Sequence, residues 1–258
     1  MSVFVDVNPG MNRTGVPEDS TEAILSLCQS IVSSGLRFRG LHYYDGHLSK
    51  YGIPERCTHA HRGYERLMHI VEALAYRIKV PEVITAGTPA FPCSLSFLGF
   101  SDPPFLHRVS PGTVVYCDTT SLAQLPPEYG YLPAVVVMTR VVSHPAPGMI
   151  TCDAGHKSVS ADAGVPTCVV VGHLELEPLT PSEEHLPMRL AAGAAAPAIG
   201  ELLFLVPRHV CTTVNNFDHA MIISGGNLIA VEPVSARGRE RPIQIVMTAH
   251  AVAGNLSL

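Results

Sequence analysis

In the first 105 residues, short apolar runs alternate with longer segments whose apolar residues recur at helical spacing. VFVDV at 3–7 and FRGLHYY at 38–44 are rich in β-branched or aromatic residues, which favours strands. Residues 19–34 and 58–79 place apolar side chains three or four positions apart, which predicts a helix after each strand. PEVITAG at 81–87 predicts a third strand. This alternation predicts βαβ units in a parallel sheet or barrel.

After about residue 105 the pattern changes to short β-type runs between proline and glycine turns. Residues 106–258 are therefore predicted to form an all-β domain, either a barrel or a sandwich. The alanine-rich stretch 187–198 is predicted to be a loosely ordered surface connection, with a short helix as the alternative. The predicted strands lie in TVVYCD (113–118), AVVVMTRVVS, MITCDAG, TCVVVGHLEL, ELLFLV and NLIAVEPV.

Charge and composition narrow the class of protein. The chain has 258 residues, only 17 Lys and Arg, and a net charge of −5, so nothing in it is suited to neutralising a nucleic-acid backbone. It has neither a membrane-length apolar run nor a signal-peptide pattern, so we expect a soluble protein of the cytoplasm with no membrane partner. The seven cysteines form no C-x-x-C pair and are predicted to be mostly buried thiols.

The loops that follow barrel strands form the active-site face of a β/α barrel. Glycine and threonine residues with free backbone N–H groups ahead of a helix suit a phosphate. Three such loops in this sequence contain candidate residues. Each residue alone is an ordinary turn residue or a solvated charge, and only their convergence on one face makes them a candidate site. The residues concerned are Arg13 in the first loop, Tyr44 and His47 in the second, and Thr85, Gly87 and Thr88 in the third.

His209 and Cys211 stand one residue apart in LVPRHVCTTVN. On a strand, side chains two positions apart share a face, with Cα atoms about 6.5 Å apart, so both would reach one metal ion. Two protein ligands would leave positions for water and substrate, as in catalytic zinc sites. By spacing alone, two inert buried side chains are the better interpretation. DAGHKSVSADAG at 153–164 is either a pair of polar turns or a loop over the barrel mouth.

Eight motifs stand in one order along the chain: DVNPGMNRTGV, LHYYDGH, TAGTP, VSPGTVVYCD, DAGHKSVSADAG, SEEH, LVPRHVCTTVN and VSARGR. This order resembles the D-serine dehydratase and D-threonine aldolase family of pyridoxal-phosphate (PLP) enzymes, whose fold is alanine racemase-like. The resemblance implies an α/β plus all-β architecture. Residues 1–105 would form the C-terminal half of a PLP-binding TIM-type barrel, and 106–258 would form a D-serine dehydratase-like β domain with a metal site.

The resemblance also implies roles for matching residues. Arg13 would contact the phenolic-oxygen side of PLP, and Tyr44 and His47 would line the ring or the substrate as catalytic residues. The metal would be Zn²⁺, because a thiolate selects zinc over harder ions. The implied phosphate loop is Thr85, Ala86, Gly87 and Thr88, and the implied metal ligands are His209 and Cys211.

The implied activity is that of a lyase for β-hydroxy D-amino acids, most like D-serine dehydratase, because the H-x-C form is typical of the zinc-dependent dehydratases. A D-threonine aldolase-type retro-aldol reaction is the near alternative. An inactive metal-binding fragment, or an interaction protein, is the alternative from another class. The expected partners are a small D-amino acid and a second copy of the chain in a homodimer.

One departure from the family concerns its cofactor-binding lysine. That residue stands at the end of the first barrel strand, whereas by motif order this chain begins near the fifth. None of Lys50, Lys79 and Lys157 has a matching context. We therefore expect the chain to be the C-terminal portion of a longer enzyme, which reading the DNA upstream of Met1 in all frames would test.

Overall fold

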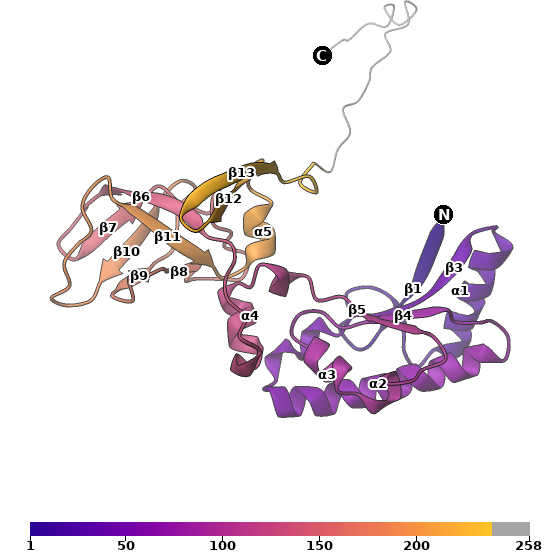
Figure 1. The fold of residues 1–258 in the computed structure, drawn as a ribbon. Helices are drawn as coiled ribbons and strands as arrows, with labels where there is room; N and C mark the ends of the chain where they lie inside the picture. The colour runs from indigo at the N-terminus through magenta and orange to yellow at the C-terminus, as the bar shows by residue number, and fades with distance from the viewer. Residues whose placement is uncertain (239–258) are drawn as a thin grey trace, which may run out of the picture. The chain divides into compact units, whose positions relative to one another are not determined.

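The computed structural model describes residues 1–238 (Figure 1). The last part of the predicted β domain, from residue 239, lies outside the described residues, as does the last residue of the motif VSARGR. The chain divides into two compact units, Met1–Thr213 and Val214–Leu258, and each is treated separately.

The first unit begins with a five-stranded sheet in the order β2-β1-β3-β4-β5, and every neighbouring pair in it is parallel. Gly40 in β3 has φ +152° and lies directly against the Glu82 carbonyl of β4, so no side chain fits there. The strand bounds are β1 Ser2–Asn8, β2 Val16–Pro17, β3 Arg37–Tyr43, β4 Glu82–Thr85 and β5 Leu106–Val109.

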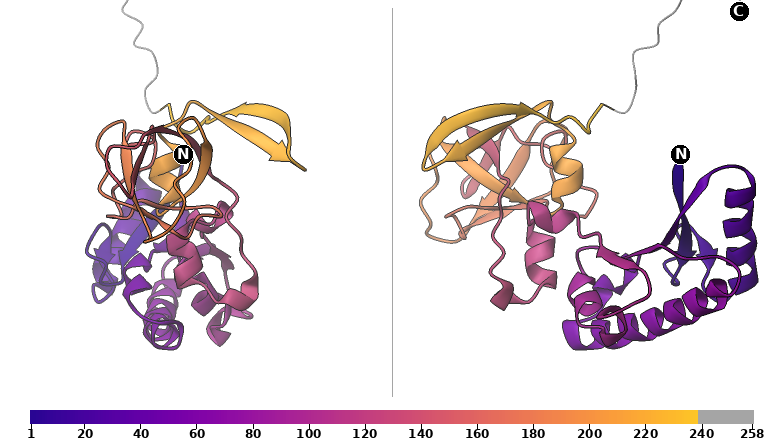
Figure 2. Two further views of the ribbon diagram at one scale, coloured as in Figure 1. Left: turned by 90° about the vertical axis from the view of Figure 1, so that its left-hand side faces the viewer. Right: turned by 45° about the vertical axis from the view of Figure 1, so that its right-hand side comes forward.

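Two helices, α1 (Thr21–Ser33) and α2 (Ile53–Ala75), cover one face of this sheet (Figures 1 and 2). Alternate strand residues point toward them, because successive side chains of a strand face opposite sides. The core between sheet and helices contains Val5, Val7, Leu41, Tyr43 and Val83 from the strands, with Ile24, Cys28, Tyr64, Leu67, Ile70 and Leu74 from the helices.

The opposite face of the sheet is polar. Glu82 of β4 pairs with Arg39 at 2.7 Å and with Arg108 at 2.8 Å, and the Asp6 carboxylate lies 2.7 Å from His42 Nδ1. The predicted alternation of strands and helices is therefore confirmed. Within the described residues the strands form an open sheet, and closure into a barrel is not observed.

The β domain is a six-stranded antiparallel sheet in the order β8-β11-β6-β7-β10-β9. The two outer strands, β8 and β9, also approach each other, so the sheet is nearly closed. Its core contains Val141, Ile150, Leu186, Met188 and Leu205. The bounds are β6 Val137–Ser143, β7 Met149–Cys152, β8 Cys168–Val170, β9 Leu176–Pro178, β10 Leu186–Leu190 and β11 Leu202–Pro207.

A connecting segment of short helices lies between β5 and β6. Its Val114 and Leu125 pack with Phe91 in a small third cluster of buried residues. The remaining helices of the first unit are η1 Gly46–Lys50, α3 Phe91–Leu95, η2 Leu98–Phe100, η3 Thr113–Val115, α4 Thr119–Gln124, η4 Pro127–Tyr129 and α5 Val210–Val214.

Some local predictions were wrong. TVVYCD forms the turn of η3 rather than a strand, and the start of the alanine-rich stretch belongs to β10. Leu186 and Met188 are fully buried there, so packing, not helix propensity, decides the conformation. Strand β5, which follows residue 105, is the fifth strand of the parallel sheet.

The second unit contains the hairpin of β12 (His219–Ser224) and β13 (Asn227–Pro233). Gly225 and Gly226 form its turn with φ +54° and +78°, which favours glycine. This strand pair confirms the prediction made from NLIAVEPV. Among the described residues, no helix combines the length and the apolar character needed to cross a bilayer.

Candidate functional site

The loop after β1 is shaped by the side chain of Asn8. Its amide oxygen accepts hydrogen bonds from the backbone N–H groups of Gly10 (3.1 Å) and Asn12 (2.9 Å). Asn12 has a left-handed backbone conformation (φ 57°), which asparagine tolerates better than most residues. The loop brings Arg13 over the ring of Tyr44, with the guanidinium carbon 4.6 Å from the ring centre.

Tyr44 also packs directly against the third loop. A Cβ atom on Gly87 would lie 2.6 Å from the Tyr44 ring, so this close approach requires glycine. The structure therefore brings together one predicted residue from each of the three loops: Arg13, Tyr44 and Gly87.

The hydroxyls of the predicted phosphate loop already have partners inside the protein. The Thr85 hydroxyl lies 2.6 Å from Ser94 Oγ and 2.8 Å from His107 Nε2, and the Thr88 hydroxyl accepts a hydrogen bond from Val114 N at 3.1 Å. Both threonines are buried. Their hydroxyls hold the loop in place, which the sequence interpretation did not anticipate.

The backbone of this loop is better placed to hold an anion. Ala86 adopts a left-handed conformation (φ 56°), which is uncommon for a residue with a side chain. Within residues 1–238, the N–H groups of Ala86 and Thr88 donate to no other backbone group. Free backbone N–H groups of this kind are typical of phosphate cradles. The loop thus fits the phosphate of PLP through its amides.

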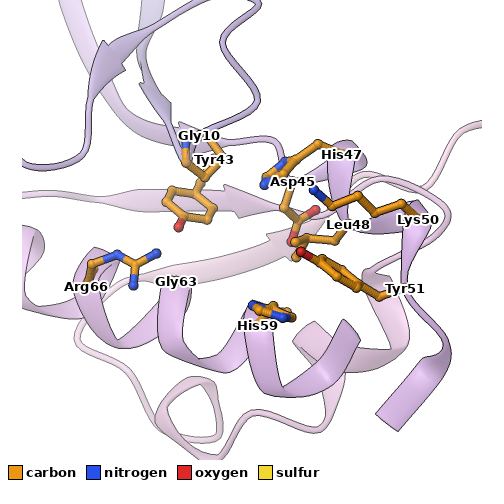
Figure 3. A pocket seen from close by; sticks show the side chains of 12 residues that line it. Gly10, Tyr43, Asp45, His47, Leu48, Lys50, Tyr51, His59, Gly63 and Arg66 are labelled. Carbon is orange, nitrogen blue, oxygen red and sulfur yellow. The ribbon is translucent and has the colours of Figure 1, made fainter. Parts of the chain in front are cut away.

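His47 faces a separate cavity of about 300 Å³ beside α2 (Figure 3). Asp45, which is 1% exposed, accepts a hydrogen bond of 2.5 Å from the Tyr64 hydroxyl. The second oxygen of Asp45 and Nδ1 of His47 are buried without a partner among the described residues. Burial raises the pKa of Asp45 to about 6 and lowers the pKa of His47.

The predicted metal ligands do not lie on a strand, so that part of the prediction was wrong. Strand β11 ends at Pro207, and Cys211 belongs to the short helix α5. Nevertheless the two side chains face each other and interact. The contact with Cys211, and next that with the Asp162 carboxylate, raise the pKa of His209 to about 9. The contact with His209 lowers the pKa of Cys211, which favours the thiolate that binds metals.

Asp162 fixes the orientation of His209. Its carboxylate lies 2.6 Å from His209 Nδ1 and accepts hydrogen bonds of 2.8 Å from the hydroxyls of Ser160 and Thr212. The acidic partner makes Nδ1 the protonated nitrogen, so Nε2 is the nitrogen left for a metal. The sequence shows Asp162 only as part of the polar stretch 153–164. Its role could not be predicted, because its partner His209 is 47 residues away.

The donor set fits a soft divalent metal such as zinc, since one imidazole and one thiolate are available. Within the described chain, no cluster of three or more His, Cys, Asp and Glu side chains is arranged to hold a metal. His209 and Cys211 therefore offer two donors to a metal and leave its other positions to water or substrate.

Two adjacent residues of the connecting segment link the two sites. The Thr113 hydroxyl lies 3.3 Å from Cys211 Sγ, and Val114 N donates to the Thr88 hydroxyl at 3.1 Å. The same segment contains Asp118, whose carboxylate accepts hydrogen bonds from Ser121 N (2.7 Å) and Val210 N (2.9 Å). The loop of residues 85–88, here called the amide-lined loop, and the His209–Cys211 pair thus both contact the connecting segment.

Comparison with known proteins places the sequence among similar chains. Residues 134–223 match the family described as "Putative serine dehydratase domain". A D-threonine aldolase of Arthrobacter sp is 28% identical over 252 residues, covering 93% of this chain and 62% of that protein. A 3-hydroxy-D-aspartate aldolase of Paracoccus denitrificans (strain Pd 1222) is 24% identical over 255 residues, covering 93% of this chain and 61% of its own length.

Solved structures show the same architecture. The D-threonine aldolase from Filomicrobium marinum has a TM-score of 0.81 at 29% identity, covering 92% of this chain and 63% of that one. An alanine racemase-like protein from Idiomarina loihiensis has a TM-score of 0.71 at 18% identity, covering 90% of this chain and 64% of that one, and shows the fold alone. The chain therefore shares its fold with these two proteins.

The chain is similar to D-threonine aldolases over most of its length, and its residues 134–223 match a serine dehydratase domain. It spans about 62% of the length of the first of these relatives.

Proposed function

We propose that this chain supplies the metal site and the phosphate cradle of a PLP-dependent lyase acting on β-hydroxy D-amino acids. The observation that carries the proposal is the pair of contacts made by the adjacent residues Thr113 and Val114. Thr113 contacts Cys211, and Val114 contacts Thr88. Because Thr113 and Val114 are adjacent, a phosphate held by the loop and a metal held by the His209–Cys211 pair would lie near each other, as an enzyme needs when cofactor and metal act on one substrate.

The cofactor, when bound, provides the electron sink for bond cleavage at the substrate Cα. The residues of this chain would hold and orient it: the amides of Ala86 and Thr88 at the phosphate, and Arg13 with Tyr44 beside the ring. His47 would act from the cavity beside α2. His209 and Cys211 would hold a divalent zinc ion, which provides a Lewis acid for the substrate hydroxyl.

Dehydration of D-serine is the leading reaction, supported by the serine dehydratase domain and by the H-x-C donor pair. Retro-aldol cleavage of D-threonine is the second candidate, because two aldolases are among the relatives. The products distinguish the two reactions: pyruvate and ammonia from D-serine, or glycine and an aldehyde from D-threonine. A second copy of the chain is the proposed partner, and light scattering on the purified protein would measure the dimer.

Ligand binding tests the proposal without depending on turnover. Pyridoxine 5′-phosphate carries the phosphate and the ring but no aldehyde, so it does not react with lysines. We expect the chain to bind it, and Arg13→Ala to weaken binding about tenfold or more through loss of a charge-assisted contact. Arg37→Ala, a change at an exposed arginine of β3, is the control. Equal affinity in all three proteins would contradict the proposed cradle.

Zinc binding tests the other half of the site. Cys211→Ala is expected to lose stoichiometric zinc in equilibrium dialysis, whereas Cys28→Ala, a change at a buried thiol of α1, retains it. If Cys211→Ala binds as much zinc as the unchanged chain, the cysteine is not a ligand and the metal part of the proposal fails.

A further inference from the structure

Two cysteines outside the proposed site meet between α2 and α3. Cys57 belongs to α2 and Cys93 to α3, 36 residues further along the chain, and their sulfur atoms are 2.6 Å apart. A disulfide bond is about 2.05 Å long, so a small movement of either side chain brings the two sulfurs to bonding distance.

The two thiols differ in access. Cys93 is fully buried, and its burial and the neighbouring Cys57 raise its pKa, so it is protonated and inert toward solutes. Cys57 is only partly buried and is therefore the thiol that a dissolved reagent meets first. One partly accessible thiol backed by one buried thiol is the arrangement of an attacking and a resolving cysteine.

The surroundings hold both helices in place. The buried guanidinium of Arg56 donates to the carbonyls of Pro89 (2.7 Å) and Gln124 (2.8 Å), and to that of Tyr51 at 2.7 Å. His61 Nε2 lies 2.9 Å from the Cys93 carbonyl. The two sulfurs therefore stay close because the backbone around them is fixed.

We propose that Cys57 and Cys93 form a reversible disulfide bond with each other. The oxidant is a low-molecular-weight disulfide such as oxidised glutathione. The Cys57 thiolate attacks one sulfur of the reagent and releases one small thiol. Cys93 then loses its proton and attacks the Cys57 sulfur, which releases the second small thiol. Two protein thiols are oxidised and one reagent disulfide is reduced.

The bond would link α2 to α3, and α3 directly follows the amide-lined loop. Ser94, next to Cys93, is hydrogen-bonded to the Thr85 hydroxyl, so the link reaches the base of that loop through one residue. The Cys57–Cys93 pair uses neither PLP nor a metal. Its oxidation does not depend on the proposed lyase activity.

The test is incubation of the purified full chain with excess oxidised glutathione and a metal chelator, followed by peptide mapping by mass spectrometry. We expect one peptide pair joined through Cys57 and Cys93, with the mass lower by two hydrogen atoms and restored by dithiothreitol. Cys28→Ser, a change at a buried thiol in the same core, should give the same link, and Cys57→Ser should give none.

A second readout is thermal stability. Closing a loop of 36 residues constrains the unfolded chain, so the oxidised protein should melt roughly 5–10 °C higher than the reduced one. Cys57→Ser should show no such shift. A stable glutathione adduct on Cys57 without the internal link, or unmodified Cys57 and Cys93 after incubation, would overturn the proposal. Mapping separates both results from any adduct on exposed Cys211.

Discussion

Asp162 selects the nitrogen that His209 presents to a metal. Because two hydroxyls and the imidazole share its two oxygens, the carboxylate has a fixed position. In Asp162→Asn, His209 loses its charged acceptor, and we expect zinc affinity to fall about 10- to 100-fold with the two ligands still in place. Competition with a chromophoric chelator measures this affinity.

Asp153→Asn is a suitable control for that change, because Asp153 lies in the same sequence motif but binds Thr139 and the Arg140 backbone. An Asp162→Asn affinity equal to that of the control would show that the carboxylate does not orient the ligand.

Asp45 makes stability depend on pH in a predictable direction. Its pKa rises from 3.8 to about 6 on folding, so the folded state binds the proton more tightly than the unfolded state. The cost of ionising it is absent below about pH 4, grows as the pH rises, and is complete above about pH 6, where it reaches about 3 kcal/mol. Asp45→Asn should therefore gain stability relative to the unchanged chain over that interval.

Urea unfolding at pH 4 and at pH 7 measures the difference for both proteins. A difference in unfolding free energy between Asp45→Asn and the unchanged chain that is the same at both pH values would show that Asp45 does not titrate in this interval.

At the scale of elements, Asp118 connects the start of α4 to the start of α5. Its buried carboxylate caps α4 through Ser121 N and also accepts from Val210 N. Asp118→Ala leaves both N–H groups without their acceptor and should lower the unfolding free energy by about 2 kcal/mol. We also expect weaker zinc binding, because α5 contains Cys211. Thr119→Ala, at an adjacent position, is the control, and unchanged zinc affinity would contradict the coupling.

The elements also show where sequence patterns suffice. Apolar spacing predicted α1, α2 and the strands β1, β3 and β4 of the parallel sheet, because one face of each is buried against the other. It did not predict β2 and β5. It placed His209 and Cys211 on a strand, because β11 is apolar up to Pro207 and the turn into α5 carries no pattern of its own. The short helix has only five residues, which is below the length at which periodicity is visible.

The site shows a second limit. Motifs identified Arg13, Tyr44 and Gly87, which do meet. The motif VSPGTVVYCD contains Thr113 and Asp118 but gave neither of them a role. These residues act through partners 90 or more positions away, such as Cys211 and Val210, and only the folded chain reveals such pairs.

At the scale of the whole first unit, the α/β core and the β-domain core are separate clusters of buried residues. We expect calorimetry to resolve two unfolding transitions. Excess zinc should raise the transition of the β domain by roughly 10–20 °C, since binding at 100 times Kd is worth about 2.7 kcal/mol. Leu186→Ala should identify that transition by lowering it, and Leu67→Ala should lower the other. A single transition moved equally by both changes would mean that the cores unfold together.

The buried guanidinium of Arg56 has a consequence for how this sequence tolerates change. Its acceptors are three backbone carbonyls, which every amino acid provides, so these hydrogen bonds place no demand on the side chains at 51, 89 and 124 but do require the guanidinium at position 56. Lysine has no planar fork with which to reach the three carbonyls at once. In a library saturated at position 56 and selected for folded protein, arginine alone should survive.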